Sequence, residues 1–303
     1  MKITLPDNSS RELPEGSSGY DLAKDIGPGL AKSAVAVTID GVQKDLHDEI
    51  MTDSSVSIIT IDSDEGLEIM RHTLTAQVLA RAIKNLYPKS KLAIGPTIED
   101  GFYYDVESEE VISSDDLNKI EEEMKKIIKS KSSITKKLVS KSEAMKVFKS
   151  NKEPYKEIII NESDQDDNFQ LYYQEDEKFV DLCRGPHLPN LGFIGSFKLT
   201  KVSGAYWKGD SNNSMLTRIY GTAFNSDKDL QQHLDNLEEA LKRDHRKLGK
   251  EMDLFHFQDE APGMVFWHPY GWNIYKTLQS FIRNKLDKNG YLEINTPQVV
   301  DRK

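Results

Sequence analysis

Cysteine is almost absent from this sequence. The 303 residues contain one cysteine, Cys183, so the chain cannot form an internal disulfide. A single thiol also excludes a zinc site built from several cysteines of the chain. Proteins without disulfides are typical of reducing compartments, and we therefore expect a cytoplasmic location.

Long hydrophobic runs and familiar nucleotide or nucleophile motifs are missing as well. No apolar run approaches the roughly 18 residues of a membrane-spanning helix, and the N-terminal MKITLPDNSS has no apolar signal core. We therefore expect neither a membrane partner nor export. Gly27 and Gly29 lack the spacing and the lysine of a phosphate-binding loop, and no serine lies in a nucleophile elbow.

Negative charge predominates, because 50 Asp and Glu residues against 40 Lys and Arg residues give a net charge of -10. This balance argues against nonspecific nucleic-acid binding, but a specific complex depends on local basic patches. Two such patches occur, and solvated helix faces or helix ends explain them equally well. They are Lys125, Lys126, Lys129, Lys131, Lys136 and Lys137, and Lys242, Arg243, His245, Arg246, Lys247 and Lys250.

Residues 1–62 have the pattern of a small α+β domain. The expected elements are strands at 2–5, 34–39 and 56–61, a helix at 20–26 stopped by Gly27-Pro28-Gly29, and a hairpin turn at Asp40-Gly41. This segment contains no cluster of catalytic residue types, so it is interpreted as a binding or spacing module.

The central residues predict a larger α+β domain. Helices are expected at 65–87, 113–130 and 142–150, and strands at 102–106, around 172–173 and 179–180, and at 197–202, 205–208 and 215–220. Farther along, Ser226 and Asp229 have capping-box spacing at the start of a long helix. A helix at 270–289 and a strand at 292–294 ending at Pro297 follow. Because Lys303 comes directly after a strand without a partner, we expect the chain to be part of a longer protein.

Cys183 and His187 form the sharpest local constellation, on a Gly-Pro loop that also carries Asp181. A converging thiol, imidazole and carboxylate can bind a metal, orient a water or act as a base. A lone cysteine is, however, more often an inert buried group. His72 and Gln77 lie on the predicted helix at 65–87, where a structural role is the usual one for a histidine.

Four stretches resemble threonyl-tRNA synthetases. They are GLEIMRH (66–72), IGPTIEDGFYYDV (94–106), RGPHLPNLGFIGSFKLTKVSGAYWKGDSNNSMLTRIYGTAF (184–224) and KRDHRKLGKEMDLFHFQDEAPGMVFWHPYGW (242–272). The resemblance covers essentially the whole chain. It implies an α+β multidomain protein, with a small β-grasp-like TGS domain at 1–62 and an editing domain shared with alanyl-tRNA synthetases at 63–224. A linker helix at 225–242 and the start of a class II antiparallel-sheet catalytic domain at 243–303, including motif 1, would follow.

The resemblance implies the N-terminal portion of an enzyme that attaches threonine to threonine tRNA using ATP. Motifs 2 and 3 and the zinc ligands of the threonine pocket have no counterpart in these residues. We therefore expect no cofactor in this chain, whereas ATP with Mg²⁺ and one Zn²⁺ are implied for the full-length enzyme, together with homodimerisation. The activity that the resemblance still implies for this chain is editing. Its candidate substrates are serine or threonine esters at the acceptor end of threonine tRNA, and the serine ester is the one hydrolysed.

The same resemblance implies the residues of the editing pocket. Cys183 and His187 match the family's CRGPH loop, Asp181 its acidic residue, Lys156 the pocket lysine and Tyr104 the aromatic residue of the FYYD strand. Together with His72 these residues form the expected site.

The helix motif departs from the family pattern R-H-S-x-A-H. Here Arg71-His72-Thr73-Leu74-Thr75-Ala76-Gln77 has one extra residue, and the second histidine is replaced by Gln77. Positions five apart lie about 140° around a regular helix, instead of about 40° for positions four apart. Either a single π-turn absorbs the insertion near 73–75, which we favour, or Thr73 and Gln77 face the pocket and His72 turns away.

Two other functions stay open. A free-standing deacylase is one, although the class II segment at 243–303 argues against it. A noncatalytic tRNA-binding module with a decayed editing site is the other, and the missing histidine favours it over the first.

Overall fold

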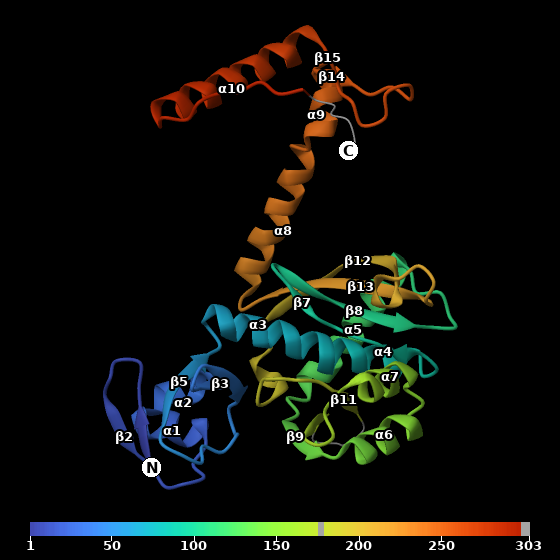
Figure 1. The fold of residues 1–303 in the computed structure, drawn as a ribbon. Helices are drawn as coiled ribbons and strands as arrows, with labels where there is room; N and C mark the ends of the chain where they lie inside the picture. Colours follow the sequence, from blue (N-terminus) through green and yellow to red (C-terminus); the bar gives the residue numbers. More distant parts are fainter. Residues whose placement is uncertain (175–178, 298–303) are drawn as a thin grey trace. The chain divides into compact units, whose positions relative to one another are not determined.

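The computed structural model describes residues 1–174 and 179–297 (Figure 1). Two compact units divide the chain, Met1–Gln231 and Gln232–Lys303. Helices and sheets occur in both, as expected for an α+β multidomain chain. No helix among the described residues is long and apolar enough to cross a membrane.

A mixed five-stranded sheet begins the first unit, in the order β2-β1-β5-β3-β4. β1 and β5 are parallel, and the other neighbours are antiparallel. The strands are β1 (Lys2–Thr4), β2 (Ser10–Glu12), β3 (Ala34–Ile39), β4 (Val42–Asp45) and β5 (Ser54–Thr60), with helices α1 (Gly19–Ile26) and α2 (Pro28–Ser33). β2 and α2 are not predicted by the sequence patterns; α2 begins at Pro28 because proline is favoured at the first helical position.

A second five-stranded sheet is antiparallel, in the order β12-β13-β8-β6 with β7 also paired to β8. Its strands are β6 (Lys91–Leu92), β7 (Thr97–Ile98), β8 (Gly101–Glu107), β12 (Ser196–Tyr206) and β13 (Met215–Phe224). The sequence predicts two separate strands at 197–202 and 205–208, but the structure has a single strand there. This strand has a register shift between Leu199 and Lys201, and Trp207–Gly209 is a 3₁₀ turn.

The helix expected at 65–87 exists but is not uniformly α-helical. It consists of α3 (Asp64–Thr73), a π-helical segment Leu74–Leu79 and α4 (Ala80–Leu86). In Figure 1 this long helix runs beneath the second sheet, and the π-helical segment contacts both β8 and β11. α5 (Leu117–Lys129) follows a 3₁₀ turn at Ser114–Asp116, whose capping box joins Ser113 and Asp116. Buried residues of these helices and of the sheet form the main core.

The main core also includes residues of the N-terminal sheet. Val35, Ala36 and Ile59 belong to the same buried cluster as Ile69 and Met70 of α3. The other face of that sheet packs on α1 through Ile3, Leu22 and Val37. The central strands of the N-terminal sheet are therefore covered on both faces, and the sheet shares a core with the segment that follows.

A three-stranded antiparallel sheet, β11-β10-β9, completes the first unit. Its elements are β9 (Ile134–Val139), β10 (Phe169–Gln174) and β11 (Val180–Leu182), with α6 (Lys141–Ser150) and α7 (Pro154–Glu162) nearby. Two features differ from the sequence predictions. β9 places Lys136 and Lys137 of the first basic patch on a strand instead of a helix face or helix end. Lys156 lies in the first turn of α7, a helix that the sequence patterns do not predict and that begins at Pro154.

The second unit begins within α8 (Asp227–Lys242), whose Ser226 cap accepts a hydrogen bond from the Asp229 N–H group at 3.2 Å. α9 (His245–Glu251), the hairpin β14 (Phe255–His256) and β15 (Phe266–Trp267), and α10 (Pro269–Lys288) follow. The strand predicted at Leu292–Ile294 is wrong: residues 291–297 have no regular structure. A strand needs a neighbour for its backbone groups, and the described residues provide none there.

Candidate functional site

The π-helical segment decides how the inserted residue is accommodated. Leu74–Leu79 forms one widened stretch within the long helix, and all six of its residues are buried. This confirms the first of the two geometries considered from the sequence: the π-helical segment starts within the expected positions 73–75 and extends to Leu79. A π-turn takes up one extra residue while the helix on either side keeps its direction. His72, at the end of α3, consequently stays oriented toward the Gly-Pro loop.

Four of the predicted residues meet between the helix and that loop. His72 Nε2 lies 2.8 Å from Cys183 Sγ, and the rings of His72 and His187 stack at 4.6 Å between centroids. Thr73 Oγ1 lies 3.1 Å from His187 Nδ1 and accepts the Leu188 N–H group at 2.9 Å. The structure therefore brings both His72 and Thr73 into the site, although the sequence presented them as alternatives.

His187 is the best placed candidate for proton transfer. Its side chain is almost fully buried, and Nδ1 is engaged by Thr73 while Nε2 has no hydrogen-bond partner among the described residues. When Nδ1 donates to the Thr73 hydroxyl, Nε2 keeps a lone pair and can accept a proton. Of the two ring nitrogens of His187, only Nε2 is therefore available to exchange a proton with a reactant.

A buried ion pair lies next to these residues. Lys156 Nζ contacts Asp181 Oδ1 at 2.6 Å, with each side chain nearly inaccessible to solvent. Burial raises the pKa of Asp181, and the Lys156 ammonium opposes this shift. The same ammonium lies 5.9 Å from the centre of the Tyr104 ring. Burial raises the pKa of Tyr104 well above its usual value, and its hydroxyl has no partner among the described residues.

Gln77 is separate from these contacts. Its side chain is fully buried, and neither amide atom forms a hydrogen bond with another described residue. Its backbone carbonyl accepts a bond from Gln174 Nε2 at 2.7 Å. The structure thus gives Gln77 a place in the interior without joining it to His72 or His187.

Three donors of the site have the chemistry of metal ligands. The ligand atoms of His72, Cys183 and His187 lie within 4.8 Å of one another. Two ligands of one tetrahedral zinc, a thiolate and an imidazole, lie about 3.5 Å apart. The 2.8 Å between His72 Nε2 and Cys183 Sγ is too short for that and corresponds to a hydrogen bond. These residues therefore do not fit a metal ion in their present arrangement.

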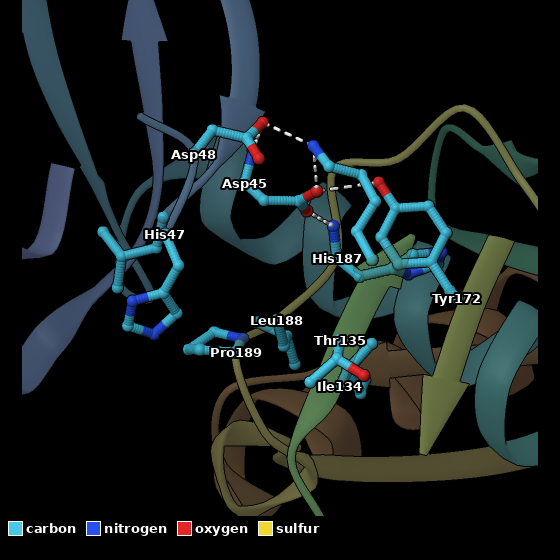
Figure 2. Close-up of a pocket in the computed structure, with 11 residues that line it drawn as sticks. Asp45, His47, Asp48, Ile134, Thr135, Tyr172, His187, Leu188 and Pro189 are labelled. Atoms are coloured by element: carbon cyan, nitrogen blue, oxygen red, sulfur yellow. Dashed lines mark hydrogen bonds and ion pairs between the residues drawn. The ribbon is translucent and has the colours of Figure 1, made fainter. Parts of the chain in front are cut away.

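Two residues of the site have no signal in the sequence analysis. Tyr172 of β10 packs edge-on against His187, with ring centroids 4.4 Å apart. Asp45, at the end of β4, accepts the His187 backbone N–H group at 2.8 Å. Figure 2 shows both side chains beside His187. Asp45 lies 142 positions before His187 in the chain, and Tyr172 lies on a different strand, so no local motif could reveal either residue.

The pH dependence of stability offers a test of the His72 environment. Burial lowers the pKa of His72 below its usual 6.5, although the Asp181 carboxylate opposes this. Below pH 6.5 the unfolded chain therefore binds a proton that the folded protein resists. We expect the free energy of unfolding to fall on acidification below pH 6.5, by at most about 1.4 kcal/mol per pH unit from this group. His72→Gln should lose this contribution, which urea titrations at pH 5 to 8 would measure. Parallel profiles for the two proteins would contradict it.

Two domain families match the chain. The TGS domain family matches residues 1–60, and the family described as the threonyl and alanyl tRNA synthetase second additional domain matches residues 170–220. The second match covers β10, β11, the Gly-Pro loop and most of β12 and β13. It therefore includes Cys183, His187 and Asp181.

Curated relatives resemble the chain along nearly its whole length. The threonine–tRNA ligase of Saccharophagus degradans is 53% identical over 300 residues, which is 99% of this chain and 47% of that protein. The chain is homologous to threonine–tRNA ligases. Those of Prochlorococcus marinus and Legionella pneumophila strain Corby are 49% and 52% identical, with the same coverage. The chain thus spans about half the length of these relatives, which form a class II aminoacyl-tRNA synthetase family. The predicted resemblance to this family and the α+β fold class with TGS and editing domains are confirmed.

Proposed function

We propose that this chain is the editing portion of a threonine–tRNA ligase and hydrolyses serine wrongly esterified to threonine tRNA. The observation that carries the proposal is the π-helical segment at Leu74–Leu79. It absorbs the inserted residue, so His72, Cys183 and His187 stay within 4.8 Å of one another. In a regular α-helix the inserted residue would rotate the residues on its two sides relative to one another, and this arrangement would be lost.

The need for such an activity follows from the substrates. Serine is threonine without one methyl group, and a missing methyl changes binding by only about 1–3 kcal/mol. A second site that admits the smaller side chain can supply the remaining discrimination. The candidate site is enclosed enough for this, because His187, Lys156, Asp181 and Thr73 are all buried.

The proposed reaction assigns a role to each group. A water attacks the ester carbonyl carbon, and His187 Nε2 accepts the proton that the water loses. The bond between the carbonyl carbon and the tRNA ribose oxygen breaks, and that oxygen takes the proton held by His187, which releases serine and tRNA and regenerates the neutral imidazole. Cys183 and His72 line the same side of the site, and Lys156 contributes positive charge for the developing oxyanion.

Access to the site is available on the side of His72. His72 lines a surface pocket together with Gln43, Pro96, Thr97 and Pro186. We propose that the single-stranded acceptor end of threonine tRNA enters there. We further propose that the whole enzyme is cytoplasmic, uses ATP with Mg²⁺ and one Zn²⁺, and forms a homodimer.

The proposal is tested by hydrolysis of preformed Ser-tRNA(Thr), with Thr-tRNA(Thr) as the control substrate. We expect selective loss of serine, and an unchanged rate after chelation because the site does not fit a metal ion. Equal, background rates for both substrates would overturn the proposal. Binding of tRNA without hydrolysis would favour the alternative function, a docking module with a decayed site, which the replacement of the second histidine by Gln77 supports.

Gln77→His tests how far the departure from the family pattern limits the reaction. An imidazole there adds a group that accepts a proton to an interior position where the amide has no partner. We expect kcat for Ser-tRNA(Thr) to increase severalfold, up to about tenfold. Gln77→Leu is the matched control, since it has similar volume and no polar atoms. An increase in both variants, or in neither, would show that an added imidazole at position 77 does not support the reaction.

A further inference from the structure

Asp45, the last residue of β4, carries a carboxylate that contacts the loop of the candidate site. Side chains two apart on a strand share a face, and on β4 these are Gln43 and Asp45. Gln43 lines the pocket that opens onto His72, whereas Asp45 lines a second pocket with Tyr172, His187 and Pro189 (Figure 2). One face of β4 thus borders the site from two sides.

The Asp45 carboxylate interacts with three donor groups of the editing domain. Oδ1 accepts the His187 backbone N–H group at 2.8 Å. Oδ2 accepts the Tyr172 hydroxyl at 2.8 Å and pairs with Lys136 Nζ at 2.8 Å. Both oxygens are therefore engaged, and each bond joins the N-terminal domain to the editing domain.

These bonds immobilise the loop that carries His187. The next backbone N–H group, that of Leu188, is bound by Thr73, so two consecutive N–H groups are held by different elements. Tyr172 packs against the His187 ring on one side, and a Cβ atom added at Gly185 would lie 2.0 Å from its hydroxyl oxygen. Tyr172, fixed by Asp45, thus defines where the backbone of the loop and the imidazole lie.

Asp45 shares its lysine partner with a second carboxylate. Lys136 also pairs with Asp48 at 2.5 Å. Burial works to lower the pKa of Lys136, but the two carboxylates outweigh it and raise this pKa. Asp48 has the same charge and the same lysine partner as Asp45, and its Oδ2 also accepts the Asp45 backbone N–H group at 3.2 Å. Among the described residues no hydrogen bond or ion pair joins it to His187 or Tyr172, and Asp48→Asn keeps a side-chain oxygen that can accept the Asp45 N–H group. Asp48→Asn is therefore a suitable control for substitutions of Asp45.

We propose that Asp45 is a positioning residue of the editing site, supplied by the TGS domain, which holds the His187 loop in its reactive conformation. This role rests on the proposed function. It explains why a carboxylate is needed at the end of β4, since no neutral side chain of that size accepts three such bonds. It also gives the N-terminal domain a part in editing beyond spacing.

The kinetic test compares Asp45→Asn and Asp45→Ala with Asp48→Asn in the full 303-residue chain. We expect both Asp45 variants to lower kcat for Ser-tRNA(Thr) about tenfold without a matching change in KM, because the imidazole is misplaced rather than removed. Asp48→Asn should stay within about twofold of the wild type. Equal losses in the Asp45 and Asp48 variants would show only a general effect of the Lys136 ion pairs and would overturn the proposal.

A second readout does not depend on hydrolysis. Cys183, the single thiol, lies on the same loop, and its Sγ contacts His72. We expect iodoacetamide to alkylate it several times faster in Asp45→Asn and Asp45→Ala than in Asp48→Asn or the wild type. An unchanged rate would overturn the positioning role, even if the wild type hydrolyses Ser-tRNA(Thr). If the wild type shows no hydrolysis, the proposed function fails, and faster alkylation would still show that Asp45 holds the loop.

Discussion

His187→Ala is expected to lower kcat for Ser-tRNA(Thr) hydrolysis by roughly 10²–10⁴-fold, the usual range for removal of a general base. His187 is the one imidazole whose free nitrogen is buried without a partner among the described residues. No neighbouring group can replace it, because His72 Nε2 is engaged by Cys183. KM should change little, since the ring contacts the reacting water rather than the tRNA.

Two comparisons make the His187 result specific. His256→Ala removes an exposed histidine of β14, outside both basic patches, and should leave the rate unchanged. Thr73→Val keeps the shape of the side chain but removes the hydroxyl that engages His187 Nδ1 and the Leu188 N–H group. We expect an intermediate loss of activity, with a shifted pH–rate profile because the His187 ring loses its partner. A wild-type rate in His187→Ala would remove this residue from the mechanism.

The candidate site could be predicted from the sequence only in part, for a physical reason. Cys183 and His187 are four residues apart, and His72 lies in a recognisable motif, so local sequence suffices for them. The π-turn follows from the same kind of information, because one inserted residue must be absorbed if the motifs on both sides keep their orientation.

Other parts depend on contacts that no local pattern contains. Asp45 touches His187 across 142 positions of the chain, and its role depends on the docking of two domains through a shared core. Lys136 looks like one member of a basic patch, but β9 brings it to Asp45 and Asp48. The strand predicted at 292–294 is wrong for the opposite reason. The local pattern of apolar residues is present, but among the described residues no neighbouring strand pairs with it.

Lys156→Met is expected to destabilise the protein by about 3–5 kcal/mol, as measured by urea denaturation at pH 7. Lys156 and Asp181 are buried to a similar, nearly complete extent, so loss of the ammonium leaves a carboxylate in the interior without a counter-charge. The double variant Lys156→Met/Asp181→Asn should recover most of this loss, because no unpaired charge remains. Lys208→Met is the control, since Lys208 pairs with Glu162 at the surface with 43% of its side chain exposed, and it should cost less than about 0.5 kcal/mol.

The cost of Lys156→Met should also depend on pH, with a sign set by Asp181. Burial already raises the pKa of Asp181 in the folded protein, and only Lys156 and weaker interactions oppose it. Without the lysine this pKa rises further above the unfolded value of about 3.9. The folded variant then holds a proton that the unfolded chain has released, so its stability falls as pH rises from about 4 toward the raised pKa. The difference from the wild type should therefore be small at pH 4 and largest near pH 7. A difference that is constant over this range would mean that Asp181 does not carry the buried charge.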